Sequence, residues 1–251
     1  MEQRIDIGWP RIFVEGTAIV ASILLAFWID AWWADSQQRQ REEVVLRALL
    51  DDLQGMRRKV DEQRSYNEAI LAATTKLLEA GVGAEQTLKP DEVDRLLRDV
   101  VWYNPSSTWE SATMSLLVSA GDLAGLSDVA LVQVLAPLHN RLERARGRYS
   151  LDETFYRDKL IPFLGMRANL PQILAGIDHA PGVPEWSYDF PDMQIANTQD
   201  HSHLLSNNEF QGLMAAKIDL QHDILNYTLE DLDDDLDEVI VKLKANLDER
   251  R

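Results

Sequence analysis

The sequence predicts an all-α protein in which one N-terminal transmembrane helix continues into a helical bundle or stalk. Near the N-terminus, a run of apolar residues is long enough to cross a bilayer. In the rest of the chain, apolar residues recur at helical spacing, and no period-2 run of useful length indicates a strand. Apolar residues make up 45% of the 251 residues, which excludes a wholly disordered chain.

Composition excludes several classes of protein. The chain has 25 basic and 42 acidic residues, a net charge of −17, whereas a general nucleic-acid binder needs a basic surface. The sequence contains no cysteine, so disulfides, thiolate zinc sites and iron–sulfur clusters are excluded. Two of the basic and five of the acidic residues lie before Ser36, so −14 of the charge belongs to residues 36–251.

The apolar run covers residues 12–34, after a short N-terminal tail at residues 1–11, and the stretch Gly16 to Ile29 carries no charge. About 23 residues of α-helix extend roughly 34 Å, enough to cross a bilayer core of about 30 Å. Aromatic side chains gather at membrane interfaces. Trp9 lies just before the run, and Trp28, Trp32 and Trp33 lie near its C-terminal end. The run therefore predicts a single-pass transmembrane helix.

Two other interpretations of the run stay open: a buried core helix of a soluble protein and an amphipathic helix lying on the membrane surface. A cleaved signal peptide fits poorly, because Trp32 and Trp33 follow the uncharged stretch 16–29 where small residues would be needed. Basic residues are almost balanced across the run, so orientation is weakly determined. We expect a cytoplasmic N-terminus and an exported C-terminal domain.

One face of the predicted span combines small and acidic side chains. At 100° per residue, Ala18, Ser22 and Ala26 form a ladder that lets another helix approach closely. Glu15 and Asp30 lie on the same face, about 22 Å apart along the helix axis and near opposite head-group boundaries. We expect this association seam to bind another membrane helix; the alternative is a chance spacing of small residues.

The first helix is expected to continue to about Glu79 and to end at Gly81 and Gly83. Its apolar positions then follow the heptad spacing of a coiled coil, with some polar insertions. The positions of this first stripe are Leu46, Leu49, Leu53, Met56, Val60, Gln63, Asn67, Ile70, Thr74 and Leu77.

Several shorter helices are expected next. The second opens at Asp91 and ends before Asn104; the third runs to Ser119. A turn covers 121–125, and Gly147 marks a break or kink between the fourth helix and residues 151–165. Ser107 or Thr108 caps the third helix and Ser127 the fourth, whose inward residues are Val129, Val132, Leu135 and Leu138.

Residues 204–247 form the longest late element. A second stripe on it can pair with the first helix in the same chain or with another chain. Its acidic residues between Glu230 and Glu238 are expected to form a solvated face, with a basic partner as the alternative. The second stripe consists of Leu225, Leu229, Leu232, Leu236, Val239, Leu243 and Leu247.

Residues 180–203 lack helical spacing and contain three prolines, which predicts an irregular loop that covers the bundle or contacts a partner. At its end, Asp200, His201 and His203 are the types of residue that bind zinc. With no further ligand identified, a surface loop that binds nothing is the stronger interpretation. Neither a phosphate-binding loop nor a nucleophile elbow or zinc-protease motif occurs in the sequence. We therefore expect no cofactor, metal or catalytic residue.

Three patches resemble an uncharacterised group of bacterial single-span membrane proteins with a helical C-terminal domain. In the first patch, the run 22–27 is followed by Ile29, Asp30 and Trp32, like the group's aliphatic span that closes on Asp or Asn and then Trp. The second patch comprises Trp109, Ser119, Gly121, Leu123, Leu126, Leu131 and Leu135, and the third is the segment 207–210 that opens a long helix. The resemblance implies a helical fold and a single-pass anchor in a bacterial inner membrane, with the exported C-terminal domain in the periplasm, but no activity.

The sequence as a whole favours a membrane-anchored scaffold or accessory subunit. Its partners would be the lipid bilayer and either further copies of itself, as a homo-oligomer, or other subunits of a membrane complex. A sensory or ligand-binding helical domain is the alternative function, and a metal-dependent enzyme is a third.

Overall fold

The computed structural model describes residues 9–83, 88–101, 109–174 and 201–250. All regular elements in these ranges are helices, which confirms the all-α class. The chain divides into two compact units, of which the first ends at Ala48 and the second begins at Leu49. The predicted irregular loop at 180–203 lies outside the described residues as far as position 200.

Helix α1 (Trp9–Val82) is a single helix of 74 residues. It begins three residues before the predicted start of the apolar run and ends close to the predicted Glu79. At its end, the Gly83 amide donates to the Glu79 carbonyl over 2.8 Å. The helix stops there because Gly81 and Gly83 favour an end over a further turn.

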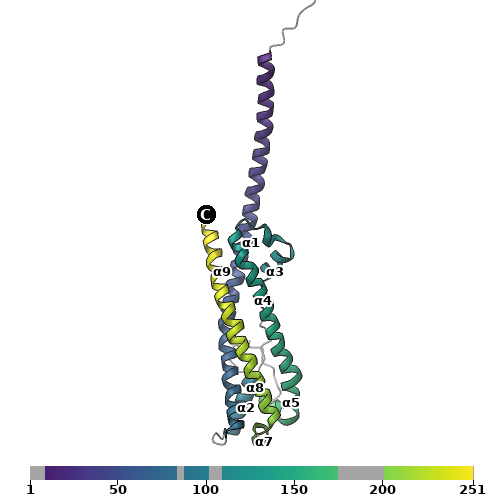
Figure 1. Cartoon of the computed structure of the whole chain (residues 1–251), viewed down its shortest axis with the longest axis vertical. Coiled ribbons are helices and arrows are strands. Elements are labelled where there is room, and N and C mark those ends of the chain that lie inside the picture. The colour runs from purple at the N-terminus through teal and green to yellow at the C-terminus, as the bar shows by residue number, and fades with distance from the viewer. Residues whose placement is uncertain (1–8, 84–87, 102–108, 175–200, 251) are drawn as a thin grey trace, which may run out of the picture. The chain divides into compact units, whose positions relative to one another are not determined.

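In the second unit, the later part of α1 lies beside α4 (Val129–Phe155), α8 (Asn208–Asp223) and α9 (Glu230–Glu249) (Figure 1). The segment α8–α9 runs antiparallel to α4. Asn246, near the end of α9, donates to Asp128 just before α4, whereas Lys217 in α8 binds Asp152 near the end of α4. Long helices joined in this way form a bundle.

The two predicted stripes form the centre of the core. All ten positions of the first stripe are buried, including the polar Gln63, Asn67 and Thr74, and all seven positions of the second stripe are buried as well. The polar members have partners inside the bundle: Asn67 donates to the Tyr149 hydroxyl over 3.2 Å, and Thr74 to the Ile70 carbonyl over 2.7 Å. The helical periods therefore predicted correctly which faces point inward.

Two π-helical turns interrupt the α-helices: η2 (Tyr156–Leu160) leads from α4 into α5 (Ile161–Arg167), and η4 (Ile224–Leu229) joins α8 to α9. The predicted break at Gly147 is wrong, since α4 continues through it. An exposed glycine costs a helix only about 1 kcal/mol. The buried Ala145 and Tyr149 on either side hold this part of α4 in the bundle.

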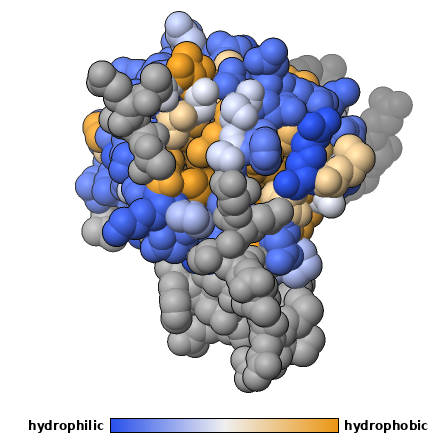
Figure 2. Space-filling model, turned by 90° about the horizontal axis from the view of Figure 1, so that it is seen from below, coloured by the Kyte–Doolittle hydropathy of each residue, from blue (hydrophilic) through white to orange (hydrophobic). Residues whose placement is uncertain are grey.

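Short helices complete the unit. They are α2 (Pro90–Val101), α3 (Ala112–Ser119), the 3-10 turn η1 (Asp122–Gly125), α6 (Leu170–Leu174) and α7 (Ser202–Leu205). A second group of apolar side chains, mainly from α1, α2, α5, α7 and α8, forms the core at the end of the bundle where α1 stops. There, Phe163 stacks on Phe210 with ring centroids 6.2 Å apart. Seen from below, hydrophilic residues surround a smaller apolar area (Figure 2).

Two predicted caps are wrong. Ser111 caps α3, with its hydroxyl accepting from the Met114 amide, whereas the predicted Ser107 and Thr108 lie outside the described residues. Asp128 caps α4 in place of the neighbouring Ser127, because its carboxylate accepts from the first amides of the helix.

This one-residue shift of the cap fits the burial along the first turns of α4. Leu135 and Leu138 point inward as predicted, but Val129 is 68% exposed and Val132 only half-buried.

Candidate functional site

The N-terminal part of α1 presents a mostly apolar surface, with Asp30 as its one charged residue between Ile19 and Trp33. Every side chain from Ile19 to Trp33 is exposed, and none of the 18 residues in the most apolar stretch is buried. Leu24 is 62% and Phe27 68% exposed. By length and composition, α1 is the one helix among the described residues that is apolar enough to cross a membrane. Such a surface marks a membrane or protein contact, because exposed apolar area is costly in water.

The helix places part of the predicted association seam on one exposed face. Ser22, Ala26 and Asp30 follow one another at intervals of four residues on α1, and all three are exposed. The side chains of Glu15 and Ala18 lie outside the described residues, so the structure describes the seam only from Ser22 onward. Intervals of four residues align side chains along a helix.

The predicted interfacial aromatics lie at the C-terminal end of the apolar surface. Trp28 is 66% exposed, Trp32 56% and Trp33 59%, while the side chain of Trp9 lies outside the described residues. Tryptophan prefers the boundary between lipid and water, because its ring is apolar and its N–H is polar.

A polar stretch of α1 follows the tryptophans. Arg39 pairs with Asp35, and Arg47 with Glu43, each pair spaced by four residues on the helix surface. Pairs of this kind stabilise a helix by about 0.3–0.5 kcal/mol each. The apolar surface therefore ends at Asp35, after which mostly charged and polar side chains cover the exposed surface of α1.

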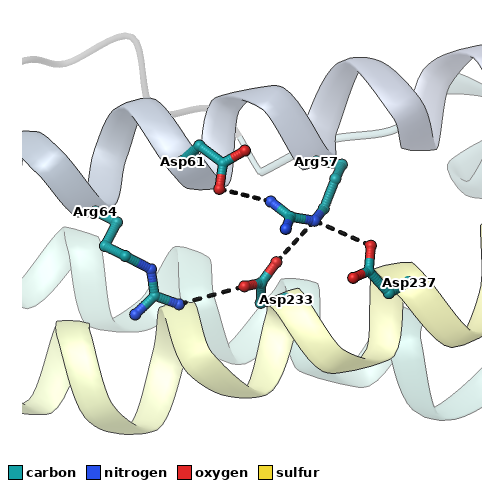
Figure 3. A network of polar contacts seen from close by, with 5 residues as sticks. All are labelled: Arg57, Asp61, Arg64, Asp233 and Asp237. Carbon is teal, nitrogen blue, oxygen red and sulfur yellow. Dashed lines mark hydrogen bonds and ion pairs between the residues drawn. The ribbon is translucent and has the colours of Figure 1, made fainter.

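Within the second unit, arginines of α1 bind the acidic residues of α9 (Figure 3). Arg57 Nε lies 2.8 Å from Asp233 and 3.0 Å from Asp237, and its Nη1 lies 2.7 Å from Asp61. Arg64 reaches the other oxygen of Asp233 over 3.5 Å. The contacts with Asp233 and Asp237 join α1 to α9, two helices that are far apart in the chain.

A third arginine binds α9, from the side of α4. Arg141 Nε lies 2.7 Å from Asp235, and its Nη1 3.3 Å from Asp231. Burial raises the pKa of Asp235 above its usual value and outweighs the opposite effect of Arg141. Five of the seven carboxylates between Glu230 and Glu238 are exposed, as expected for a solvated face, whereas Asp233 and Asp235 are only partly exposed. Basic residues of the same chain bind four of these carboxylates, which the sequence did not predict.

The sequence contains a signal for this arrangement. On α9, Asp231 and Asp235 are spaced by four residues, and so are Asp233 and Asp237, with the buried Leu232 and Leu236 between the two pairs. Acidic pairs on both flanks of an apolar stripe are typical of a helix between two charged neighbours.

The two histidines of the weak metal-site pattern differ in burial and in their contacts. His201 is buried and its Nε2 lies 2.7 Å from Asp94 Oδ1 on α2, so it connects α7 to α2. His203 is exposed, and Asp200 lies outside the described residues. Among the described residues, no group of three or more His, Asp or Glu side chains is arranged to hold a metal ion. His201 is thus a packed residue rather than part of a surface loop.

A buried ion pair was not expected from the sequence. Lys217 Nζ lies 2.6 Å from Asp152 Oδ1, and the two side chains are 2% and 4% exposed. Burial lowers the pKa of Lys217 and outweighs the attraction of Asp152. The signal was present in α8, because Lys217 and Gln221 continue the spacing of the buried Phe210 and Met214 toward the core.

Comparison with known proteins gives no relative: no family model, curated protein or solved structure matches the chain. Function must therefore be inferred from the described residues themselves.

Proposed function

We propose that the chain is a membrane-anchored helical scaffold or accessory subunit that acts through helix–helix association. The observation that carries this proposal is the apolar surface of α1 between Ile19 and Trp33, whose most apolar stretch has no buried residue. A core helix of a soluble protein would be covered by other elements, and no described element covers this one. The exposed tryptophans at its end further support a membrane boundary.

The proposed location is the inner membrane of a bacterium, with a cytoplasmic N-terminus and the bundle in the periplasm. The physical basis is an apolar segment with no small-residue cleavage site after it, since Trp32 and Trp33 follow the uncharged stretch 16–29. Such a segment acts as a signal-anchor that exports the C-terminal part of the chain.

The proposed mode of action is packing of the seam against another membrane helix. Small side chains at Ser22 and Ala26 permit close backbone approach, which gives contacts that lipid does not replace. An acidic group such as Asp30 is costly near hydrocarbon unless a partner or the head-group region receives it. The partner is a second copy of the chain or a subunit of a larger membrane complex.

The bundle supports a structural role. Several of its charged residues connect helices, as Arg57 and Arg141 do on the two sides of α9. We propose on this basis that the bundle presents a stable surface and is not a catalytic centre.

Substitution on the seam tests the association. Replacing Ala26 with Ile separates the helices, so we expect the full chain in detergent to lose associated mass, by native mass spectrometry or crosslinking. Leu24→Ile, which adds no volume on another face, is the matched control and should assemble normally. Equal assembly of both variants would contradict the seam, and a bare monomer in the unaltered protein would contradict association through the span.

A further inference from the structure

The interior of the bundle contains a polar cluster that the anchoring proposal does not use. It consists of Asp152 on α4 and of Lys217 and Gln221, one turn apart, on α8. Counted over the whole residue, their exposed fractions are 3%, 2% and 0%. Lys217 Nζ lies 2.6 Å and Gln221 Nε2 3.5 Å from the same oxygen, Asp152 Oδ1. Two donors from one helix therefore converge on one acceptor of another.

One atom of this cluster lacks a hydrogen-bond partner. Gln221 Oε1 is fully buried, and no described residue donates to it. The Lys217 ammonium has three N–H donors, and among the described residues Asp152 is the one acceptor that it contacts. Buried polar groups almost always have a partner, either in the protein or in ordered water. The cluster thus combines an unused acceptor with unused donors.

Rotating the Gln221 amide by 180° does not solve the problem. The amide oxygen would then face the Asp152 carboxylate, and the amide N–H groups would take the position that has no acceptor. The orientation in the structure, with Nε2 toward Asp152, is the favourable one. The missing partner must therefore come from outside the side chains of the cluster.

The chemistry of the cluster selects the class of partner. It must donate to an amide oxygen and accept from an ammonium group. A metal cation cannot accept a hydrogen bond and a chloride ion cannot donate one, whereas water does both. Because the three side chains are almost completely buried, the partner must be a small molecule.

We propose that Asp152, Lys217 and Gln221 form an internal binding site for one ordered water molecule. The water donates to Gln221 Oε1 and accepts from Lys217 Nζ, and it completes a polar connection between α4 and α8. The site lies immediately before both π turns, since the Asp152 carbonyl accepts from the Tyr156 amide and the Gln221 carbonyl from the Ile224 amide. Each π turn changes the helical phase there.

Counting long-lived internal waters tests the site. Oxygen-17 magnetic relaxation dispersion on the full chain in detergent reports such waters, and Gln221→Met keeps the side-chain volume while removing both polar atoms. We expect this variant to lose one long-lived water. Gln211→Met on the same helix is the control, because that amide donates to the Gly81 and Leu205 carbonyls, and its count should equal that of the unaltered protein.

A second measurement does not depend on the variant folding. A structure of the unaltered full chain that resolves waters should show one density within hydrogen-bond distance of both Gln221 Oε1 and Lys217 Nζ. An empty site, a protein group bonded to Oε1, or an unchanged water count in a folded Gln221→Met variant would each overturn the proposal.

Discussion

At the scale of single residues, a few close contacts fix how neighbouring helices meet. The end of α1 approaches the backbone of Leu205, the last residue of α7, so closely that only glycine fits at position 81. Gln211 Nε2 then joins both segments, 2.9 Å from the Gly81 carbonyl and 3.0 Å from the Leu205 carbonyl. At the other end of the bundle, Asp52 on α1 accepts from the Ser111 hydroxyl and the Thr113 amide at the start of α3.

Gly81→Ala should destabilise the protein by about 1–3 kcal/mol, the usual cost of overpacking. An added Cβ would lie 2.4 Å from the Leu205 carbonyl oxygen, so the backbones would have to separate. Denaturant unfolding followed by circular dichroism measures the change. The control is Gly147→Ala, where a Cβ meets nothing within 4 Å; it should stabilise α4 by up to about 1 kcal/mol. Equal stability of the two variants would contradict the close contact.

Asp52→Asn should destabilise the protein at neutral pH by about 1 kcal/mol. Burial acts to raise the pKa of Asp52, but the hydrogen bonds from Thr113 and Ser111 outweigh it and hold the pKa below its usual value. Because the folded state favours the charged form, this stability is present above the ordinary pKa of about 3.9 and is lost as the pH falls through the lowered value.

Unfolding measured from neutral pH to about pH 2 checks this dependence. The difference between the unaltered protein and Asp52→Asn should shrink at the acid end. Asp51→Asn, one residue away and exposed, should show no such difference. A difference that stays constant with pH would mean that the hydrogen bonds to Ser111 and Thr113 do not depend on the charge of Asp52.

At the scale of elements, apolar period predicted the long helices but not their joints. The two stripes identified the inward faces of α1 and α9 correctly, because burial repeats regularly along an α-helix. The π turns were not predictable in this way, since an extra residue changes the phase and leaves Ile224 and Leu225 both buried. Gly147 misled the prediction because the sequence does not show that Ala145 and Tyr149 hold α4 in place.

Arg57→Ala should loosen α9 from α1 and destabilise the protein by about 1–2 kcal/mol, because the half-buried Asp233 loses its nearest cation. Arg58→Ala is the matched control, since Arg58 is exposed. Unfolding at low and high salt measures both variants, and the effect of Arg57→Ala should diminish with salt. Equal stability of the two variants would show that the contacts in Figure 3 contribute little.

At the scale of the whole molecule, the chain combines an exposed apolar helix with an acidic bundle. The sequence predicted that the apolar run and the tryptophans near its C-terminal end lie on one continuous helix. It did not predict the arginine contacts of α9 or the polar cluster at Lys217, because these depend on which helices become neighbours. Charge counts along one helix do not reveal whether the counter-charge lies in solvent or on another helix.

The central proposal is that α1 anchors the protein in a membrane, and carbonate extraction tests it most directly. The full chain should remain in carbonate-washed membranes, because its apolar surface has no other cover among the described residues. A variant that lacks residues 1–35 should move to the soluble fraction as a folded helical protein. Release of the full chain by carbonate, or retention of the truncated chain in the membrane, would contradict the anchoring role of α1.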